Sequence, residues 1–408
     1  MKKIKVLTIC YCDSGGGAAI ASNRLNKIIK KKVSLRQIVI EKRLKDRDIK
    51  IHGNFFENKI LRRLRSRIAS VIVLNEKNFT ISLNILNSGL GKLINRSNCD
   101  IVHFHSINSE TISLDELNSI EKPTILTAHD MWLGLGIFHY SIDKQIFFRK
   151  ISIIKKKYFS LIDRYIKNKK KRIIRKKNFF ITSPSKWLDK WFQKRGIFST
   201  NIPNTIDSKN KVKKYDKYKY LLELKKRGEI LIYISNILNE QRKGGHFIKN
   251  LINENFFLKN NYYLILIGKN NNFYDLEYIK NKNIIYLSYI KNFDELRYLL
   301  KISDLCLFPS LIDNLPNTIM ESLQVGTPVI AFDKYGMKEM ISHKKTGYLC
   351  KKFSKHSFQD GITKFLNFQK INKKKIYINC KNFFEKNYGY KIIIKKYINL
   401  YKKILEKN

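Results

Sequence analysis

Short apolar runs recur along the chain, and each ends in a polar or glycine-rich turn. Ten of them begin at Ile4, Leu35, Asp100, Thr124, Phe179, Glu229, Tyr262, Asn283, Leu305 and Thr327. Longer segments with helical periodicity separate these runs. Runs this apolar, without strict alternation, are typical of strands buried on both faces, and their alternation with helices indicates parallel sheets. The pattern predicts an α/β protein.

A polar stretch near the middle of the chain divides this pattern in two. Residues 201–220 carry turn signals and no apolar period, while strand and helix runs flank them on both sides. We therefore expect two doubly wound, Rossmann-like domains over 1–205 and 206–385, facing each other across a cleft, with an amphipathic helix over 386–408. In such sheets ligands bind outside the carboxyl ends of the strands, and every motif below follows a strand.

The charge is extreme, with 81 Lys and Arg against 33 Asp and Glu, a net +48. Such an excess can indicate a nucleic acid or an anionic membrane as partner. Lysine is accompanied here by much Asn, Ile, Phe and Tyr and by little Ala, Gly and Pro, so a general compositional drift would supply most of the charge. The sequence has no helix-turn-helix, zinc-finger or RNA-recognition signature, and we expect no specific nucleic acid partner.

One basic stretch differs from the rest. Residues 147–180 interleave aromatic and aliphatic residues with cations at spacings that a helix would sort into two faces. Interfacial helices have this pattern. The stretch predicts contact with an anionic membrane surface.

The six cysteines are scattered, and the one close pair, Cys10 and Cys12, is C-x-C. Neither a disulfide framework nor a zinc site is favoured, which suits a reducing cytosol. The first residues imitate a signal peptide, but the apolar run is short and stops in Asp-Ser-Gly, so a buried strand is the better interpretation. No run approaches the ~18 apolar residues of a membrane span. We expect a cytoplasmic protein, with peripheral attachment to the plasma membrane as an open alternative.

The segment "DNLPNTIMESLQVGTPVI", which begins at Asp313, predicts a loop, a helix and a strand. Asp313 or Asn314 can cap the helix and Pro316 suits its first turn, while Gly326 and Pro328 stop it. A helix N-terminus presents unpaired N–H groups and partial positive charge, which favours phosphate.

Glu321 lies little more than one turn inside this helix, and its side chain leans back toward the N-terminus. One sugar away from a phosphate, it could accept hydrogen bonds from two ribose hydroxyls. The plainer alternative is a solvated acid on a helix surface.

Two further turns lie where a ligand could bind. In "NEQRKGGHF", Arg242 and Lys243 precede a predicted helix, where a fixed cation would stabilise charge on a departing nucleoside diphosphate without a metal. In the first half, "DSGGG" places Gly15, Gly16 and Gly17 between a strand and a helix, where backbone can approach a ligand closely. Each could also be a structural turn.

Together these segments resemble the retaining GT-B glycosyltransferases of glycosyltransferase family 4, closest to the colanic-acid type that builds bacterial surface polysaccharides. The resemblance rests on Asp313, seven residues, Glu321 and then "VGTPVI", and on the Arg-Lys-Gly turn. It also rests on "HDMW" at His129 and on the stretches 181–192 and 202–207. These matches occur in the family's order and cover most of the chain.

The resemblance implies roles for single residues. The first acid, Asp313, would contact donor sugar hydroxyls, and Glu321 would bind the ribose. Pro316 stands where the family often has glycine, so the N–H groups of Asn317 and Thr318 would contact phosphate. Asn236 stands where the family has an arginine, and Arg242 could substitute for it.

The first domain would bind the acceptor and the second the donor, with the last helix returning to the first. His129 would contact the donor sugar near the reacting centre, and the glycine loop would face the diphosphate. Asp130 would orient that imidazole, meet an acceptor hydroxyl, or simply cap the next helix. The expected catalytic residues are His129, Lys243 and Asp313. The expected donor-binding residues are Gly16, Gly17, Asn236, Arg242, Lys243, Asp313, Asn314, Leu315, Asn317, Thr318 and Glu321.

The implied function is a metal-independent, retaining hexosyltransferase that moves a sugar from a nucleotide sugar donor to a glycan or polyprenyl-linked acceptor, with no cofactor. A non-catalytic nucleotide-sugar-binding protein and a basic nucleic-acid-binding protein are the alternatives. Two patterns are set aside as metal sites: Asp46-Arg-Asp48, because it lies in a polar turn, and His103 with His105, which share a strand face without a third ligand.

Overall fold

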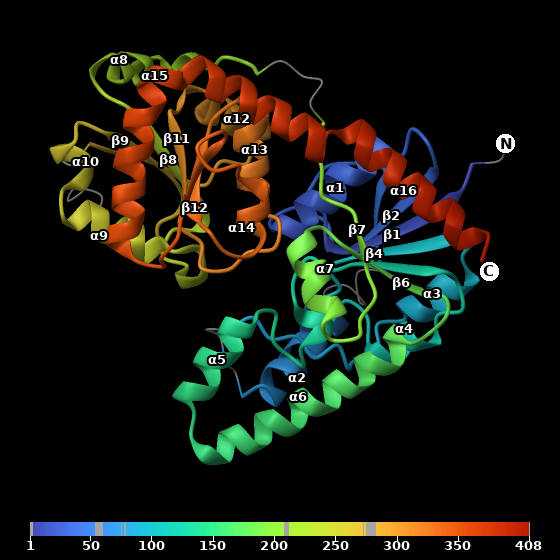
Figure 1. Cartoon of the computed structure of the whole chain (residues 1–408). Coiled ribbons are helices and arrows are strands. Elements are labelled where there is room, and N and C mark those ends of the chain that lie inside the picture. Colours follow the sequence, from blue (N-terminus) through green and yellow to red (C-terminus); the bar gives the residue numbers. More distant parts are fainter. Residues whose placement is uncertain are drawn as a thin grey trace. The chain divides into compact units, whose positions relative to one another are not determined.

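A computed structural model describes residues 3–53, 60–74, 76, 79–207, 212–271, 273–274 and 283–407. The chain forms two compact units. Unit 1 comprises Met1–Thr205 and Ile393–Asn408, and unit 2 comprises Ile206–Ile392. Each unit is a parallel sheet with helices packed on it, as Figure 1 shows.

The sheet of unit 1 has seven strands in the order β3-β2-β1-β4-β5-β6-β7, and all its neighbours are parallel. Its strands are β1 (Lys5–Cys12), β2 (Ser34–Glu41), β3 (Ile49–Ile51), β4 (Ile101–His105), β5 (Thr124–Thr127), β6 (Phe179–Ser183) and β7 (Thr200–Asn201). Its helices are α1 (Gly17–Ile29), α2 (Arg62–Ile72), α3 (Leu90–Arg96), α4 (Leu114–Ser119), α5 (Ser141–Lys150), α6 (Ile153–Ile174), α7 (Lys186–Gln193) and α16 (Tyr390–Leu405).

The C-terminal helix α16 belongs to the core of unit 1. Its Ile393, Tyr397, Tyr401 and Ile404 are buried together with residues of the sheet and of α1. Tyr401 also brings a polar atom to the sheet, because its hydroxyl lies 2.9 Å from His103 Nδ1 on β4.

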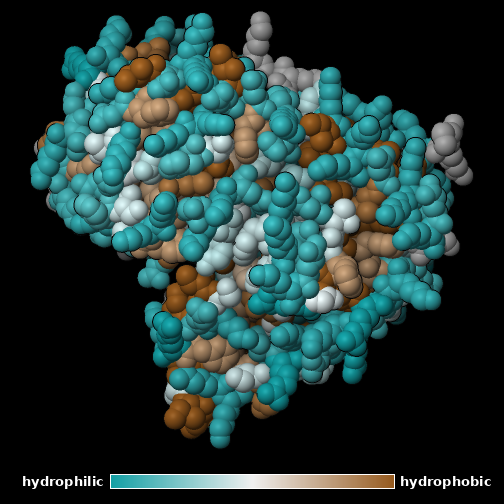
Figure 2. Space-filling view, viewed as in Figure 1, coloured by the Kyte–Doolittle hydropathy of each residue, from teal (hydrophilic) through white to brown (hydrophobic). Residues whose placement is uncertain are grey.

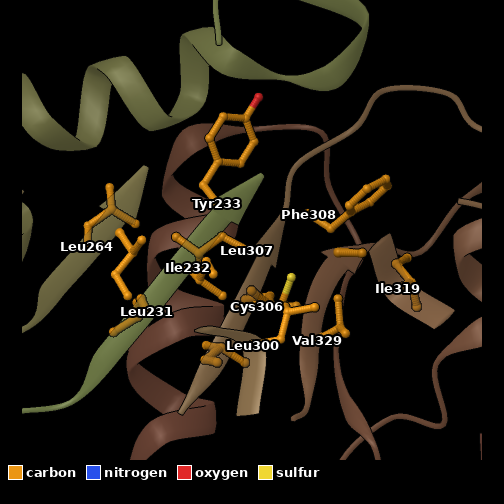
Figure 3. Packing of buried hydrophobic residues seen from close by; sticks show 14 of the residues in the cluster. Leu231, Ile232, Tyr233, Leu264, Leu300, Cys306, Leu307, Phe308, Ile319 and Val329 are labelled. Atoms are coloured by element: carbon orange, nitrogen blue, oxygen red, sulfur yellow. The ribbon is translucent and has the colours of Figure 1, made fainter. Parts of the chain in front are cut away.

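The sheet of unit 2 has six parallel strands in the order β10-β9-β8-β11-β12-β13. Its strands are β8 (Ile230–Ile237), β9 (Tyr263–Lys269), β10 (Ile284–Leu287), β11 (Leu305–Phe308), β12 (Val329–Phe332) and β13 (Gly347–Cys350). Its helices are α8 (Lys219–Arg227), α9 (Gly245–Asn253), α10 (Phe256–Lys259), α12 (Phe293–Ile302), α13 (Asn317–Val325), α14 (Tyr335–Met340) and α15 (Lys355–Tyr388). Figure 3 shows how side chains from β8, β9, β11 and β12 pack with those of the helices in its core.

All ten strands expected from the apolar runs are present, and the doubly wound α/β architecture is confirmed. The sequence missed β3, β7 and β13, which have three, two and four residues. They are too short to show a period, and each lies at the edge of its sheet.

The expected single helix over the basic stretch 147–180 is wrong. The chain forms the end of α5, breaks at Ile151 and Ser152, continues as α6, and enters β6 at Phe179. The Ser152 hydroxyl caps α6 by accepting a hydrogen bond from the Lys155 N–H. Among the described residues, no helix combines the length and the apolar run that a bilayer crossing requires.

In each sheet the first strand lies between the second and the fourth, so the winding direction reverses beside it. This reversal lies between β1 and β4 in unit 1, and between β8 and β11 in unit 2. Loops that leave neighbouring strands there turn to opposite faces and leave a ligand-binding crevice at the carboxyl ends.

Candidate active site

The loops after β8 and β11 interlock at the reversal point of unit 2. Gly244 has the left-handed φ of 75°, and a Cβ there would lie 2.0 Å from the carbonyl oxygen of Pro309. The Leu311 N–H donates to the Arg242 carbonyl at 2.9 Å. A glycine is therefore required at 244, because only a residue without Cβ lets the two loops approach this closely.

An ion pair joins the two loops. Lys243 Nζ donates to Asp313 Oδ2, and Arg242 Nη1 lies 3.7 Å from the same oxygen. Burial would raise the pKa of Asp313, but the two cations outweigh burial, and the pKa lies below its usual value. Arg242 itself is held by Glu240 at 2.7 Å and by the Ile312 carbonyl at 3.2 Å. Arg242 thus holds the loop after β8 against the loop after β11, and the Lys243 ammonium group supplies the positive charge where the two loops meet.

Helix α13 begins later than the sequence indicated. Its N-cap is Pro316, with no side-chain cap, so the expectation that Asp313 or Asn314 caps it is wrong. Asp313 is already engaged by Lys243, and its other oxygen accepts the Asn314 N–H at 3.0 Å. Asn317 and Thr318 are the first two helical residues, and both are half-buried. Their N–H groups are among those that a helix cannot satisfy internally.

Glu321 lies in the second turn of α13 with 4% of its surface exposed. The alternative of a solvated surface acid is therefore wrong. The Glu321 carboxylate affects Cys306 on β11. Burial raises the pKa of the Cys306 thiol to about 12, and the negative charge of Glu321 adds to that rise. Gly326 ends the helix with φ 91°, as expected.

The remaining expected donor residues lie nearby with different exposures. Asn314 is buried, and its carbonyl lies so close to Gly336 that a Cβ there would clash. Leu315 belongs to the hydrophobic core of unit 2, so its side chain packs and only its backbone could face a ligand. Asn236, near the end of β8, is exposed.

Figure 3 shows Tyr233 and Phe308 at the outer end of this core. Lys243 Nζ lies 5.7 Å from the centre of the Phe308 ring, and its carbonyl faces the Tyr233 hydroxyl at 3.5 Å. The Phe308 ring, at the end of β11, stabilises the ammonium group, since a cation near a ring face interacts with the ring quadrupole. Tyr233 holds the backbone of Lys243.

The reversal point of unit 1 carries the glycine loop. Gly15 has φ 91°, Gly16 is the extended N-cap of α1, and Gly17 is its first residue. Asp13, which the sequence analysis did not single out, anchors this loop by accepting the N–H groups of Arg43 and Leu44 at 2.9 and 3.0 Å.

Three histidines follow one another: His103 in the middle of β4, His105 at its end, and His129 just after β5. His103 and His105 have ring centres 4.2 Å apart, as their shared strand face predicted, and His105 Nδ1 lies 3.2 Å from His129 Nε2. Burial lowers the pKa of His129 to about 4, against a smaller opposing effect of Asp130. Burial also lowers the pKa of His103 to about 3. His129 is therefore neutral at pH 7.

Asp130 is occupied within its own unit. One oxygen accepts the Trp132 N–H at 2.9 Å, and the other lies 2.7 Å from His139 Nδ1. His139 Nε2 in turn faces the Ser82 hydroxyl at 2.9 Å. The N-cap of the turn Trp132–Gly134 is Met131, and it has no side-chain cap, so the alternative that Asp130 caps the next helix is wrong. Asp130 instead contacts the imidazole of His139.

Helix α6 holds the loop that follows His129 and Asp130. Lys170 is fully buried and donates to the carbonyls of Trp132 and Gly136, with its Nζ 3.8 Å from the centre of the Trp132 ring. Asp163, also buried, accepts the Ile137 N–H at 2.9 Å and pairs with Lys144 at 2.7 Å. Desolvation lowers the pKa of Lys170 well below its usual value. Sorting into an apolar and a cationic face fails at Lys170, which lies among the buried residues of α6.

Residues 216–401 match the family model described as Glycosyl transferases group 1. The match covers most of unit 2 and a little under half of the chain. An uncharacterized glycosyltransferase of Haemophilus influenzae is 25% identical over 75 residues, which is 18% of this chain and 21% of the relative. The chain thus spans about a fifth of the length of that curated relative.

Solved structures support the same fold. Anabaena Alr3699/HepE in complex with UDP-glucose has TM-score 0.67 and 14% identity, over 98% of this chain and 100% of that one. WaaG, a glycosyltransferase involved in lipopolysaccharide biosynthesis, has TM-score 0.63 and 14% identity, over 96% and 98%. The chain therefore has the GT-B fold of two Rossmann-like domains, and the group 1 match supports a glycosyltransferase.

Within the group 1 match, the structure brings Arg242, Lys243 and Asp313 into contact at the start of α9 and α13. Outside it, Gly16, Gly17, His129 and Asp130 lie at strand ends of unit 1. Sequence reasoning missed Asp13, Ser82, His139 and Lys170, because each acts through a contact with a distant part of the chain.

The residues of both patterns set aside as metal sites make other contacts, since His103 contacts the Tyr401 and Thr127 hydroxyls. Asp46 Oδ1 accepts the Asp48 N–H at 3.0 Å, and Asp48 pairs with Lys30, so the D-x-D turn is satisfied by the chain itself. Across the part of the chain that the structure describes, no group of three or more His, Cys, Asp or Glu side chains is placed to hold a metal.

Proposed function

We propose that the chain is a retaining, GT-B glycosyltransferase of the family 4 type, which moves a sugar from a nucleotide diphosphate donor to a glycan or polyprenyl-linked acceptor. The observation that carries the proposal is the junction of Lys243 and Asp313 at the reversal point of unit 2, beside the starts of α9 and α13. A cation next to two helix N-termini suits a diphosphate.

In this proposal, Lys243 and the N–H groups of Asn317 and Thr318 bind the diphosphate and stabilise the charge that develops as it departs. Asp313 accepts hydrogen bonds from the donor sugar, and Glu321 accepts them from the ribose. Because fixed protein dipoles and Lys243 supply the charge stabilisation, the reaction is proposed to need no metal and no cofactor.

Unit 1 is proposed to serve the acceptor side. Gly16 and Gly17 allow close approach of the backbone, and a neutral His129 can donate a hydrogen bond to the donor sugar without repelling a cationic transition state. Asp130 would have to exchange a bond with His139 or Trp132 to meet an acceptor hydroxyl.

We propose front-face attack with retention at the anomeric carbon. The acceptor oxygen bonds to that carbon as the bond to the phosphate oxygen breaks, and the acceptor proton passes to the departing phosphate. No residue of the site is proposed as a covalent nucleophile.

The role proposed is surface polysaccharide biosynthesis in the cytoplasm. The likeness to a lipopolysaccharide glycosyltransferase supports it, as do six cysteines that are all free, which suits a reducing compartment. A UDP-sugar is the first donor to test, because the HepE structure contains UDP-glucose.

The test is a panel of UDP-, GDP-, ADP- and CMP-sugars with the full chain. Thermal unfolding measures binding, since a ligand bound only to the folded state raises Tm, and release of free nucleotide measures reaction. A shift with release supports the transferase. A shift without release even with added acceptor glycans favours the non-catalytic binding protein. No shift with any sugar nucleotide, together with salt-sensitive binding to duplex DNA, favours the nucleic-acid alternative.

A further inference from the structure

Helix α6 carries two apolar lines on opposite sides. One line packs into unit 1 and contains the buried residues Phe159, Asp163, Ile166, Lys170 and Ile173. The other line repeats at intervals of four, three and four residues, which places it along one side of a helix. It consists of Ile154, Tyr158, Leu161 and Tyr165.

This second line faces solvent. Ile154 is 82% exposed, Leu161 66% and Tyr165 55%. Single exposed apolar residues are ordinary, but a row of them along one helix needs a partner to cover it.

Helix α2 extends the exposed apolar surface. None of its residues is buried, and Leu64, Ile68 and Val71 are exposed at helical spacing. The Tyr158 hydroxyl donates to the Ile72 carbonyl at 2.7 Å, so the two helices lie side by side. We call the exposed apolar residues of these helices the α2–α6 face: Leu64, Ile68, Val71, Ile154, Tyr158, Leu161 and Tyr165.

The exposed charges on these two helices are all positive, although Lys155 Nζ lies 3.9 Å from the carboxylate of Glu76, which follows α2. The only acid of α6 is the buried Asp163, and α2 contains none. Arg62 is paired with Glu41 at 2.9 Å. The other cations of the two helices lie among the apolar residues: Arg63, Arg65, Arg67, Lys155, Lys156, Lys157, Arg164, Lys167, Lys171 and Arg172. Figure 2 shows apolar surface gathered at the turn from α5 into α6, with hydrophilic residues around it.

We propose that the α2–α6 face binds an anionic lipid surface, with the two helices lying in the interface. The apolar residues would enter the boundary between headgroups and acyl chains, and the cations would bind anionic headgroups. This inference does not rest on the proposed function, because it uses neither the donor nor the acceptor residues.

Two other occupants fit the face less well. A second copy of the chain would bring like charges together, since the helices expose cations and no acids. A nucleic acid would bind the cations but leave the exposed isoleucine and leucine side chains without a partner.

The first test is co-sedimentation of the full chain with vesicles of phosphatidylcholine, with and without about one third phosphatidylglycerol, an anionic lipid. We expect binding to the mixed vesicles alone at physiological salt. The double variant Ile154→Gln/Leu161→Gln should bind about tenfold more weakly. Ile371→Gln is the matched control, because Ile371 is 88% exposed on α15 in unit 2, and it should bind like the unaltered chain.

The second test separates this face from the charge of the whole chain. Lys157→Gln/Arg164→Gln should weaken binding about tenfold, whereas Lys374→Gln/Lys375→Gln, an exposed pair on α15, should leave it unchanged. Equal losses in both pairs would mean that net charge alone drives binding, and would overturn the proposal. Absence of binding by the unaltered chain would overturn it as well.

Insertion itself is tested by fluorescence. Ile154→Trp places an indole at the most exposed of the large hydrophobic residues of α6, and brominated lipids should quench its fluorescence. Ile371→Trp provides the control that should not be quenched. Binding without quenching of the indole at position 154 would contradict the insertion of this face.

Discussion

The variant Gly16→Ala tests whether the fold or a bound ligand requires glycine at position 16. Gly16 has φ −162°, an extended conformation open to any residue, and a Cβ there would meet nothing within 4 Å. No residue of unit 1 that the structure describes therefore requires glycine at this position. If the loop lines the donor, the requirement comes from the ligand.

The effect on stability can be worked from the structure. Gly16 is the N-cap of α1, and alanine is a poorer N-cap by about 0.5–1 kcal/mol. Alanine also restricts the unfolded chain, which stabilises by about 0.4–1 kcal/mol. These terms nearly cancel, so we expect the free energy of unfolding to change by less than about 0.5 kcal/mol.

The effect on activity should be much larger. A methyl group that displaces the donor by about 1 Å would lower kcat/KM by about 100-fold. The assay is urea unfolding beside nucleotide release from the donor identified by the panel. Gly196→Ala is the opposite control: Gly196 also has open space around it but φ 69°, so alanine should cost about 1 kcal/mol of stability and leave kcat/KM unchanged. Wild-type kcat/KM in Gly16→Ala would refute the placement of the loop beside the donor.

Three further outcomes are expected. Glu321→Ala should weaken nucleotide binding by about 1–3 kcal/mol in calorimetry, because ribose hydroxyls lose their acceptor, and unchanged affinity would exclude that role. The buried histidines should make stability depend on pH: burial lowers the pKa of His103 to about 3 and of His129 to about 4, below the ordinary 6.5. The unfolded chain then binds more protons below about pH 6.5, so the free energy of unfolding should fall from there toward pH 4. Urea titrations at pH 7 and pH 5 measure this, and equal values would contradict the buried neutral state. Finally, EDTA should leave sugar transfer unchanged if Lys243 and the helix N-termini suffice, and restoration of lost activity by Mg²⁺ would show a metal requirement.

The sequence predicted the helices and strands that have a regular pattern of apolar residues. Continuous apolar runs identify strands buried on both faces, and the turn at Gly326 was expected because glycine in the left-handed region ends helices. The short edge strands lack any repeat. Candidate residues after β8 and β11 were found because both loops follow buried strands, and the reversal point lies between those strands.

Contacts between distant segments were not predictable in the same way. Lys243 pairs with Asp313, 70 residues away. Because Asp313 is engaged in this ion pair, it does not cap α13 as expected. Helix α6 has apolar residues at helical spacing on two sides, so its sequence cannot say which side packs. Burial of Lys170 could not be predicted from the helix alone, because it depends on the carbonyl groups of Trp132 and Gly136 in a distant loop.

The central claim is that Lys243 binds the diphosphate of a sugar nucleotide. Calorimetric titration of the panel's best sugar nucleotide into the unaltered chain and into Lys243→Met tests it most directly, with Lys259→Met, an exposed lysine of α10, as control. Loss of a charge-assisted bond should weaken binding about 10- to 100-fold in Lys243→Met and leave the control unchanged. Equal affinity of Lys243→Met and the unaltered chain would contradict the account.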